Sequence, residues 1–182
     1  MNKKEQIIDI ATKLFSEKGY ENTPLSIICE KANVSKGLIS HHFKSKDGLL
    51  REIFKKSTNV IIKINESKKE DLPVKEQLKD LLNSYFKQLE ANKLAFQFDL
   101  NVMMQPRTRE VLQDLIQERS AMILKYTHKI FDKLDANKSN ILSYVFIAEL
   151  DGIALSFFLG ISPEYPLEEI KNHLIEKYLN NK

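Results

Sequence analysis

The chain of 182 residues has little of what metal-binding and catalytic proteins use. Cys29 is its only cysteine, so no intramolecular disulfide can form and no set of cysteines can bind a metal. The four histidines show no metal-ligand spacing along the expected helices. A glycine-rich phosphate loop and a nucleophile elbow are also absent from the sequence. The sequence therefore predicts no metal, no cofactor and no enzymatic activity.

Glycine and proline are scarce, with five of each, and most of them stand at the edges of periodic stretches. That scarcity favours long helices, and no stretch has the apolar-polar alternation that indicates a strand. The hydrophobic content of 42% and charged content of 29% are ordinary for a folded globular protein, which argues against disorder. The sequence therefore predicts an all-α fold of about nine helices.

Long hydrophobic runs are missing as well. The longest run, residues 153–161, contains Ser156 and Gly160 and is too short to cross a bilayer. The N-terminal residues, MNKKEQIIDIATKLF, are interrupted by charges and lack the apolar core of a signal peptide. Together with the single cysteine, these features predict a cytoplasmic protein that has no membrane partner.

Positive charge is unevenly distributed along the chain, although the formal net charge is only +3. Residues 1–56 contain 11 lysines and arginines against 7 acidic residues, whereas residues 57–182 contain 17 against 18. The basic excess therefore belongs to the N-terminal third, as expected if that part contacts phosphates. A solvated surface with a chance asymmetry is the alternative.

Residues 23–50 have the pattern of two short helices joined by a tight turn and followed by the start of a longer helix. Another helix is expected before them, over residues 3–18. Capping residues mark the expected helix boundaries. Gly19 is the expected left-handed C-cap of the first helix, and Thr23 is the expected N-cap of the second, with Pro24 at its first helical position. A turn with positive φ is expected at Asn33, and N-caps are expected at Ser35 and Ser45. This is the layout of a helix-turn-helix module, which places its second helix in a DNA groove.

The helix expected over residues 36–43 has two unlike faces. At about 100° per residue, Ile39 and Phe43 share a face that must pack on the preceding helices. Gly37 and His41 lie on the opposite face, where small and polar groups suit base edges and glycine permits close approach to a duplex. The residues expected to approach DNA are Lys36, Gly37, Leu38, Ser40 and His41. The alternative is a face that is merely solvated.

Residues 8–49 resemble the DNA-binding domain of TetR/AcrR-type transcriptional repressors. The resemblance rests on Ala11, Leu14, Phe15, Gly19, Tyr20, Thr23, Ile28, Ala32, Val34, Ser35, Lys36, Gly37, Ile39, His42, Phe43, Ser45, Lys46, Asp47 and Leu49. The chain departs from the family pattern at Pro24, Cys29, Asn33 and Ser40. Ser40 replaces a usual tyrosine, so one customary backbone contact is in doubt and part of the half-site is expected to be read differently.

The resemblance implies a homodimer whose two modules enter successive major grooves of a pseudo-palindromic operator. It implies base contacts from the five residues given above and phosphate contacts from Thr23, Ser35, His42 and Lys46. It also implies a DNA-binding domain over residues 1–48 and a helical regulatory and dimerisation domain over residues 49–182.

Six further helices are expected in the rest of the chain, with a linker at residues 67–71. They are expected at residues 46–66, 74–89, 94–104, 106–134, 140–159 and 167–179. The helix over residues 140–159 is apolar nearly all round and therefore needs cover on every side. The last two helices are thus the expected dimer interface, as in TetR-like proteins, with Asp151, Ile153, Leu155, Phe157, Leu174 and Tyr178 as candidate contacts.

Aromatic and methionine side chains recur in the expected helices of the second domain, where TetR-like proteins bind an inducer. The candidate effector residues are Tyr85, Phe86, Phe96, Asp99, Met103, Met122, Tyr126 and Phe146. For any one of them, an ordinary core position is the alternative. Asp99, Glu149 and Asp151 stand within apolar runs, and a buried carboxylate needs a partner. A lipophilic cation fits if one of them lines the pocket, and a neutral or acyl ligand fits if none does.

Two function classes follow from these features. The first is a ligand-responsive repressor, a homodimer that effector binding releases from its operator. The second is a constitutive DNA-binding or architectural protein with a filled core and no effector.

Overall fold

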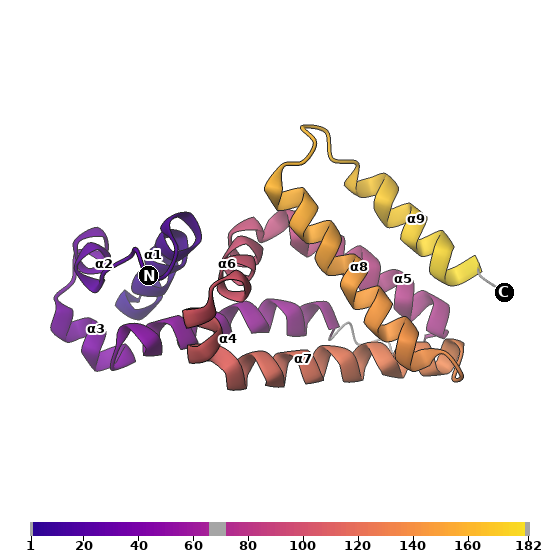
Figure 1. Ribbon diagram of the computed structural model, residues 1–182, viewed down its shortest axis with the longest axis horizontal. Helices are drawn as coiled ribbons and strands as arrows, with labels where there is room; N and C mark the ends of the chain where they lie inside the picture. The colour runs from indigo at the N-terminus through magenta and orange to yellow at the C-terminus, as the bar shows by residue number, and fades with distance from the viewer. Residues whose placement is uncertain (1, 66–71, 181–182) are drawn as a thin grey trace. The chain divides into compact units, whose positions relative to one another are not determined.

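The structure is a computed structural model of the chain and describes residues 2–65 and 72–180. Within these residues it contains helices and no strand, which confirms the predicted all-α class (Figure 1). The helices are α1 (Lys3–Lys18), α2 (Leu25–Ala32), α3 (Lys36–Phe43), α4 (Lys46–Asn65), α5 (Val74–Ala91), α6 (Lys93–Met104), α7 (Pro106–Leu134), α8 (Ser139–Leu159) and α9 (Leu167–Asn180). The expected linker at 67–71, and Glu66 at the expected end of the fourth helix, lie outside the described residues.

Local capping explains most of the boundaries in the N-terminal part. The Ser35 hydroxyl accepts a hydrogen bond from the backbone N–H of Leu38 at 3.2 Å, and Ser45 does the same for Gly48 at 3.0 Å. Asn33 ends α2 with φ 49° and ψ 56°, as predicted. Gly19 ends α1 with a φ of 80°, a region that favours glycine, although its ψ of 160° differs from the left-handed helical value expected.

The predicted N-cap of α2 at Thr23 is wrong. Pro24 occupies the cap position and no side chain caps this helix. Thr23 is instead fully buried, and its hydroxyl donates to the carbonyl oxygens of Gly19 at 2.8 Å and Leu14 at 3.4 Å. The side chain therefore satisfies carbonyl groups at the C-terminal end of α1 rather than N–H groups at the N-terminus of α2.

Packing divides the described chain into two compact units. The first unit comprises residues 1–59 and 94–117, and the second comprises residues 60–93 and 118–182. Helices α4 and α7 each contribute residues to both units. These units are defined by which residues pack together. The expected domains, residues 1–48 for DNA binding and 49–182 for regulation and dimerisation, are defined by function and stay a prediction.

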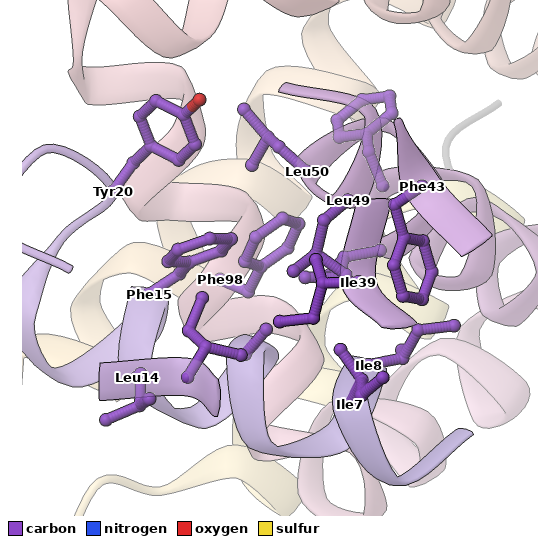
Figure 2. Close-up of a cluster of buried hydrophobic side chains, with 14 of the residues drawn as sticks. Ile7, Ile8, Leu14, Phe15, Tyr20, Ile39, Phe43, Leu49, Leu50 and Phe98 are labelled. Carbon is purple, nitrogen blue, oxygen red and sulfur yellow. The ribbon is translucent and has the colours of Figure 1, made fainter. Parts of the chain in front are cut away.

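The core of the first unit joins residues that are far apart in the sequence. Ile7, Phe15, Ile39 and Leu50 of the N-terminal helices are fully or almost fully buried in one cluster. The same cluster contains Phe98 and Val102 from α6 and Leu112 from α7. Figure 2 shows Phe98 among the side chains of the N-terminal helices. The helix-turn-helix module is therefore packed on a segment that follows it by some distance in the sequence.

The second unit is held by packing of α5 on α9 and by an aromatic cluster. The rings of Phe131, Phe146 and Tyr178 meet edge to face, with centroids 5.2 to 5.4 Å apart. The Tyr178 hydroxyl donates to the Glu149 carboxylate at 2.8 Å, and the Lys177 ammonium pairs with the same carboxylate. Glu149, one of the carboxylates embedded in an apolar run, therefore has its partners on α9.

Helix α8 leaves large apolar side chains uncovered in the single chain. Ile141 is 60% exposed and Tyr144 is 55% exposed. By length and mean hydropathy, 1.7, α8 is also the one helix in the described part of the chain that could cross a membrane. Its apolar residues do not form one long run, because Glu149 and Asp151 interrupt them. A helix that packs between two subunits has the same length and composition, so this property alone does not indicate a membrane.

Candidate nucleic-acid interface

Helix α3 has the two faces that the sequence predicts. Ile39 and Phe43 are buried in the core of the first unit. Gly37, Ser40 and His41 are exposed on the other side of the helix. The helix is therefore fixed by its apolar face and offers polar and small groups to a partner, which is the requirement for reading base edges in a major groove.

Gly37 is not required by the fold itself. Its φ lies outside the left-handed region, and a Cβ placed there would have the Ser35 Oγ, 3.7 Å away, as its nearest neighbour. Glycine within a helix costs about 0.5–1 kcal/mol relative to alanine. Gly37 is the second residue of α3, where this cost is smaller than in the middle of a helix, and the described chain does not require glycine at this exposed position.

Two lysines flank a shallow open hollow beside α3. Its lining comes from the start of α2, the start of α3 and the start of α4, through Pro24, Leu25, Ser26, Cys29, Lys36 and Lys46. The start of α2 borders the hollow, and no side chain caps the first backbone N–H groups of this helix. Positive charge and helix N-termini together favour a phosphate.

Lys46 is held in a defined place at the start of α4. Its ammonium lies 4.2 Å from the centroid of the Tyr20 ring, within the range of a cation–π contact. Partial burial lowers the pKa of Lys46, while the negative charges of Asp47 and Glu21 act in the opposite direction. The Tyr20 hydroxyl donates to the Asp47 carboxylate, so Lys46, Tyr20 and Asp47 form one cluster.

The structure separates the nine predicted DNA-binding residues into two groups. Ser35, Lys36, Gly37, Leu38, Ser40, His41, His42 and Lys46 are exposed or half-buried. Thr23 has no exposed surface, and its backbone N–H donates to the Tyr20 carbonyl oxygen at 3.2 Å. The prediction that Thr23 offers its side chain to a phosphate is therefore corrected, for the same reason that it does not cap α2.

The predicted effector residues belong to two different packing units. Tyr85, Phe86, Met122, Tyr126 and Phe146 lie in the second unit, whereas Phe96, Asp99 and Met103 lie in the first. Asp99 accepts a hydrogen bond from the buried hydroxyl of Ser57 at 2.8 Å. This contact gives Asp99 a hydrogen-bonding partner on α4 within the first unit.

The predicted interface residues differ in how far they are available in the single chain. Asp151 is exposed, and Ile153, Leu155 and Phe157 are half-buried. Leu174 is only 4% exposed, and Tyr178 is engaged with Phe131, Phe146 and Glu149 within its own unit. Leu174 is therefore a core residue, and the exposed Ile141, Tyr144 and Val145 of α8 were missed as interface candidates.

Arg107 is a residue of this region to which the sequence assigned no role. Its guanidinium donates to the second oxygen of the Asp47 carboxylate at 3.1 Å, from a helix that begins far along the chain. No local pattern marks such a contact, because helix periodicity and capping describe only neighbouring residues. The described part of the first unit thus brings Arg107 to the cluster of Lys46, Tyr20 and Asp47.

Comparison with known proteins agrees with this geometry. Residues 7–53 match the family described as bacterial regulatory proteins, tetR family. The fatty acid metabolism regulator protein of Bacillus subtilis (strain 168) is 30% identical over 122 residues, which are 66% of this chain and 60% of that protein. The biofilm operon icaADBC HTH-type negative transcriptional regulator IcaR of Staphylococcus aureus (strain Newman) is 40% identical over 68 residues, 36% of this chain and 37% of that one. The chain thus spans less than two thirds of the length of these two relatives.

A solved structure extends the likeness over the whole chain. The crystal structure of a transcriptional regulator from Aquifex aeolicus VF5 is 28% identical, with a TM-score of 0.71 and coverage of 97% of both chains. The match includes the helices beyond the helix-turn-helix as well as the module itself. The family consists of regulatory proteins rather than enzymes. Residues 7–53 thus match the DNA-binding module of the tetR family of bacterial regulatory proteins, and the whole chain is similar to a solved regulator of the TetR/AcrR type.

Proposed function

We propose that this protein is a cytoplasmic, ligand-responsive repressor that binds a pseudo-palindromic DNA operator as a homodimer and is released by a small-molecule effector. The observation that carries the DNA-binding part is the exposed face of α3, with Gly37, Ser40 and His41 outward while Ile39 and Phe43 are buried. A glycine that the fold does not need supports close contact with a surface outside the chain.

The roles within the interface divide into reading and anchoring. Ser40 and His41 carry hydrogen-bonding groups suited to base edges, and Leu38 offers an apolar contact beside them. Lys36 and Lys46 flank the hollow and suit two phosphates, with Ser35 and His42 next to them. Because Ser40 is shorter than the family's usual tyrosine, we expect its part of the half-site to be read differently from that of relatives.

The α8 part of the proposed pairing through α8 and α9 is supported by the uncovered apolar surface of α8. Ile141, Tyr144 and Val145 are exposed in the single chain, and exposed apolar patches of this kind mark interaction sites. Asp151, Ile153, Leu155 and Phe157 continue the same helix toward its C-terminus. A second copy of the chain would cover these residues and would supply the second reading helix that a two-fold symmetric site requires.

The effector is proposed to be partly apolar and to bind among aromatic and methionine side chains of the second unit, with Tyr85, Met122 and Tyr126 as candidates. The relative named a fatty acid metabolism regulator makes fatty acids and their acyl derivatives the first class to examine. The pairing of Glu149 with Lys177 and Tyr178 gives this carboxylate of the second unit its partners within the chain, which favours an acyl or neutral ligand over a cation.

Selection of duplexes from a random library by the purified chain tests the proposal. We expect enrichment of a two-fold symmetric site whose half-sites lie roughly one helical turn apart, about 10 base pairs. Binding to that site should weaken as fatty acids or their acyl derivatives are added, because an effector that prefers the released state lowers DNA affinity.

Three results distinguish the alternatives. Enrichment of a symmetric site without release by any small molecule would favour a constitutive regulator. Salt-sensitive binding without enrichment of any sequence would favour an architectural protein. Absence of DNA binding altogether would contradict the proposal.

A further inference from the structure

A chain of contacts connects the first turn of α7 with the first turn of α4 inside the first unit. The Arg107 guanidinium donates to Asp47 Oδ2 at 3.1 Å, and the Tyr20 hydroxyl donates to Asp47 Oδ1. The Tyr20 ring in turn lies 4.2 Å from the Lys46 ammonium. Asp47 therefore has one oxygen for each donor, and its carboxylate is fixed from two sides.

Tyr20 is the rigid part of this cluster. Its side chain is almost fully buried, and its ring meets Phe15 edge to face with a centroid distance of 5.2 Å. Burial and the hydrogen bond to Asp47 raise the pKa of the Tyr20 hydroxyl above its usual value, so it remains a proton donor. The Tyr20 ring is therefore held in place, and its face makes a cation–π contact with the Lys46 ammonium.

The negative charge of Asp47 opposes phosphate binding by Lys46 unless another residue balances that charge. It is the next residue along the chain, and its side chain is 41% exposed. An unbalanced carboxylate at this position would attract the Lys46 ammonium and would repel a phosphate that approaches it. Arg107 holds Oδ2 with one arm of its guanidinium and pairs with Glu110 at 3.0 Å through the other. It therefore offsets part of the Asp47 charge, so the carboxylate attracts the lysine less and presents less negative charge to DNA.

Anchoring of α7 on α4 does not depend on Arg107 alone. The Arg51 guanidinium binds both oxygens of Asp114, at 2.7 and 2.6 Å, and donates to the Val111 carbonyl oxygen at 2.9 Å. Arg51 lowers the pKa of Asp114 to about 2, so this pair is charged throughout the neutral range. A second, stronger tie therefore holds the same two helices when the contact between Arg107 and Asp47 is removed.

We infer that Arg107 is a positioning residue for DNA binding, which acts on the phosphate-binding Lys46 through Asp47 and Tyr20. This inference rests on the proposed function, because it assigns Lys46 a phosphate. It places a determinant of DNA affinity on α7, outside the helix-turn-helix module.

A double-mutant cycle on the full chain tests the inference. The affinity for a mixed-sequence duplex long enough for two successive major grooves is measured over a series of salt concentrations. We expect Arg107→Ala to weaken binding about fivefold in the wild-type background and less than about twofold in the Lys46→Ala background. Arg107→Lys should retain most of the affinity, because it keeps the charge beside Asp47.

Arg109→Ala is the matched control, since it removes the same charge from an exposed position two residues along the same helix. We expect it to change the affinity less than about twofold. Equal effects of Arg107→Ala in both backgrounds, or equal effects of Arg107→Ala and Arg109→Ala, would overturn the inference while leaving the proposed function intact. Partial unfolding of Arg107→Ala by circular dichroism would show that Arg107 is only an anchor. A wild-type chain that does not bind the duplex would overturn both proposals.

Discussion

Gly37→Gln should give a protein that is more stable than the wild type and binds DNA roughly a hundredfold more weakly or worse. The gain in stability is expected because glutamine is a better helix former than glycine, by roughly 0.5–1 kcal/mol in a helix interior and by less at the second residue of α3. The position can accept a side chain, since the nearest atom to a Cβ there is the Ser35 Oγ at 3.7 Å.

The loss of DNA affinity follows from the place of Gly37 on the exposed face of α3. A long side chain there would hold the helix away from the base edges that Ser40 and His41 are proposed to contact. Each lost base contact is worth about 1–3 kcal/mol, and a dimer loses the contact in both of its helix-turn-helix modules. Urea denaturation and DNA affinity measured on one preparation check the two opposite effects together.

A graded series is the control for Gly37. Gly37→Ala adds only a methyl group, so it should share the gain in stability but lose less affinity than Gly37→Gln. A Gly37→Gln protein that binds its selected duplex as tightly as the wild type would contradict the placement of this face against DNA.

Phe98→Ala should lower the free energy of unfolding by about 3–5 kcal/mol. Phe98 is on α6, outside the helix-turn-helix module, but it is only 1% exposed and belongs to the same buried cluster as Phe15 and Leu49 (Figure 2). Replacement by alanine removes the ring from that cluster and leaves a cavity, which the surrounding helices can fill only in part. We expect the loss to appear in urea denaturation followed by circular dichroism.

Leu94→Ala is the matched control, because Leu94 lies on the same helix and is 39% exposed. Its substitution should change the free energy of unfolding by no more than about 0.5 kcal/mol. Similar effects of the two substitutions would contradict the packing of α6 in the core of the first unit.

Helix boundaries were predictable because their causes are local. Ser35 and Ser45 are flanked by apolar periodicity of the helical kind, and Pro106 stands at the start of α7. Thr23 was mispredicted by the same reasoning, since a threonine before a proline has the sequence of an N-cap whether or not its side chain faces the helix it precedes. Burial against α1 decided its role, and burial is not a local property.

The division of α3 into a buried and an exposed face was predictable for a similar reason, whereas the contacts that support the helix were not. Eight residues of helix fix which side chains share a face, so the separation of Ile39 from His41 could be read from spacing alone. The contacts of Asp47 with Arg107, and of Ser57 with Asp99, join residues 60 and 42 positions apart. No periodicity predicts them, and the placement of α6 and the start of α7 with the DNA-binding module depends on such contacts.

Base preference measured for His41→Ala and Lys46→Ala on the same randomised duplex library tests the central claim most directly. If α3 reads DNA through its exposed face, His41→Ala should relax the preference at one or two base pairs, at a cost of about 1–3 kcal/mol. Lys46→Ala should weaken binding about equally for all sequences. It should also reduce the slope of log affinity against log salt concentration by roughly one for each bound helix-turn-helix module. Loss of affinity in both variants without any change in base preference would contradict the division of this surface into reading and anchoring residues.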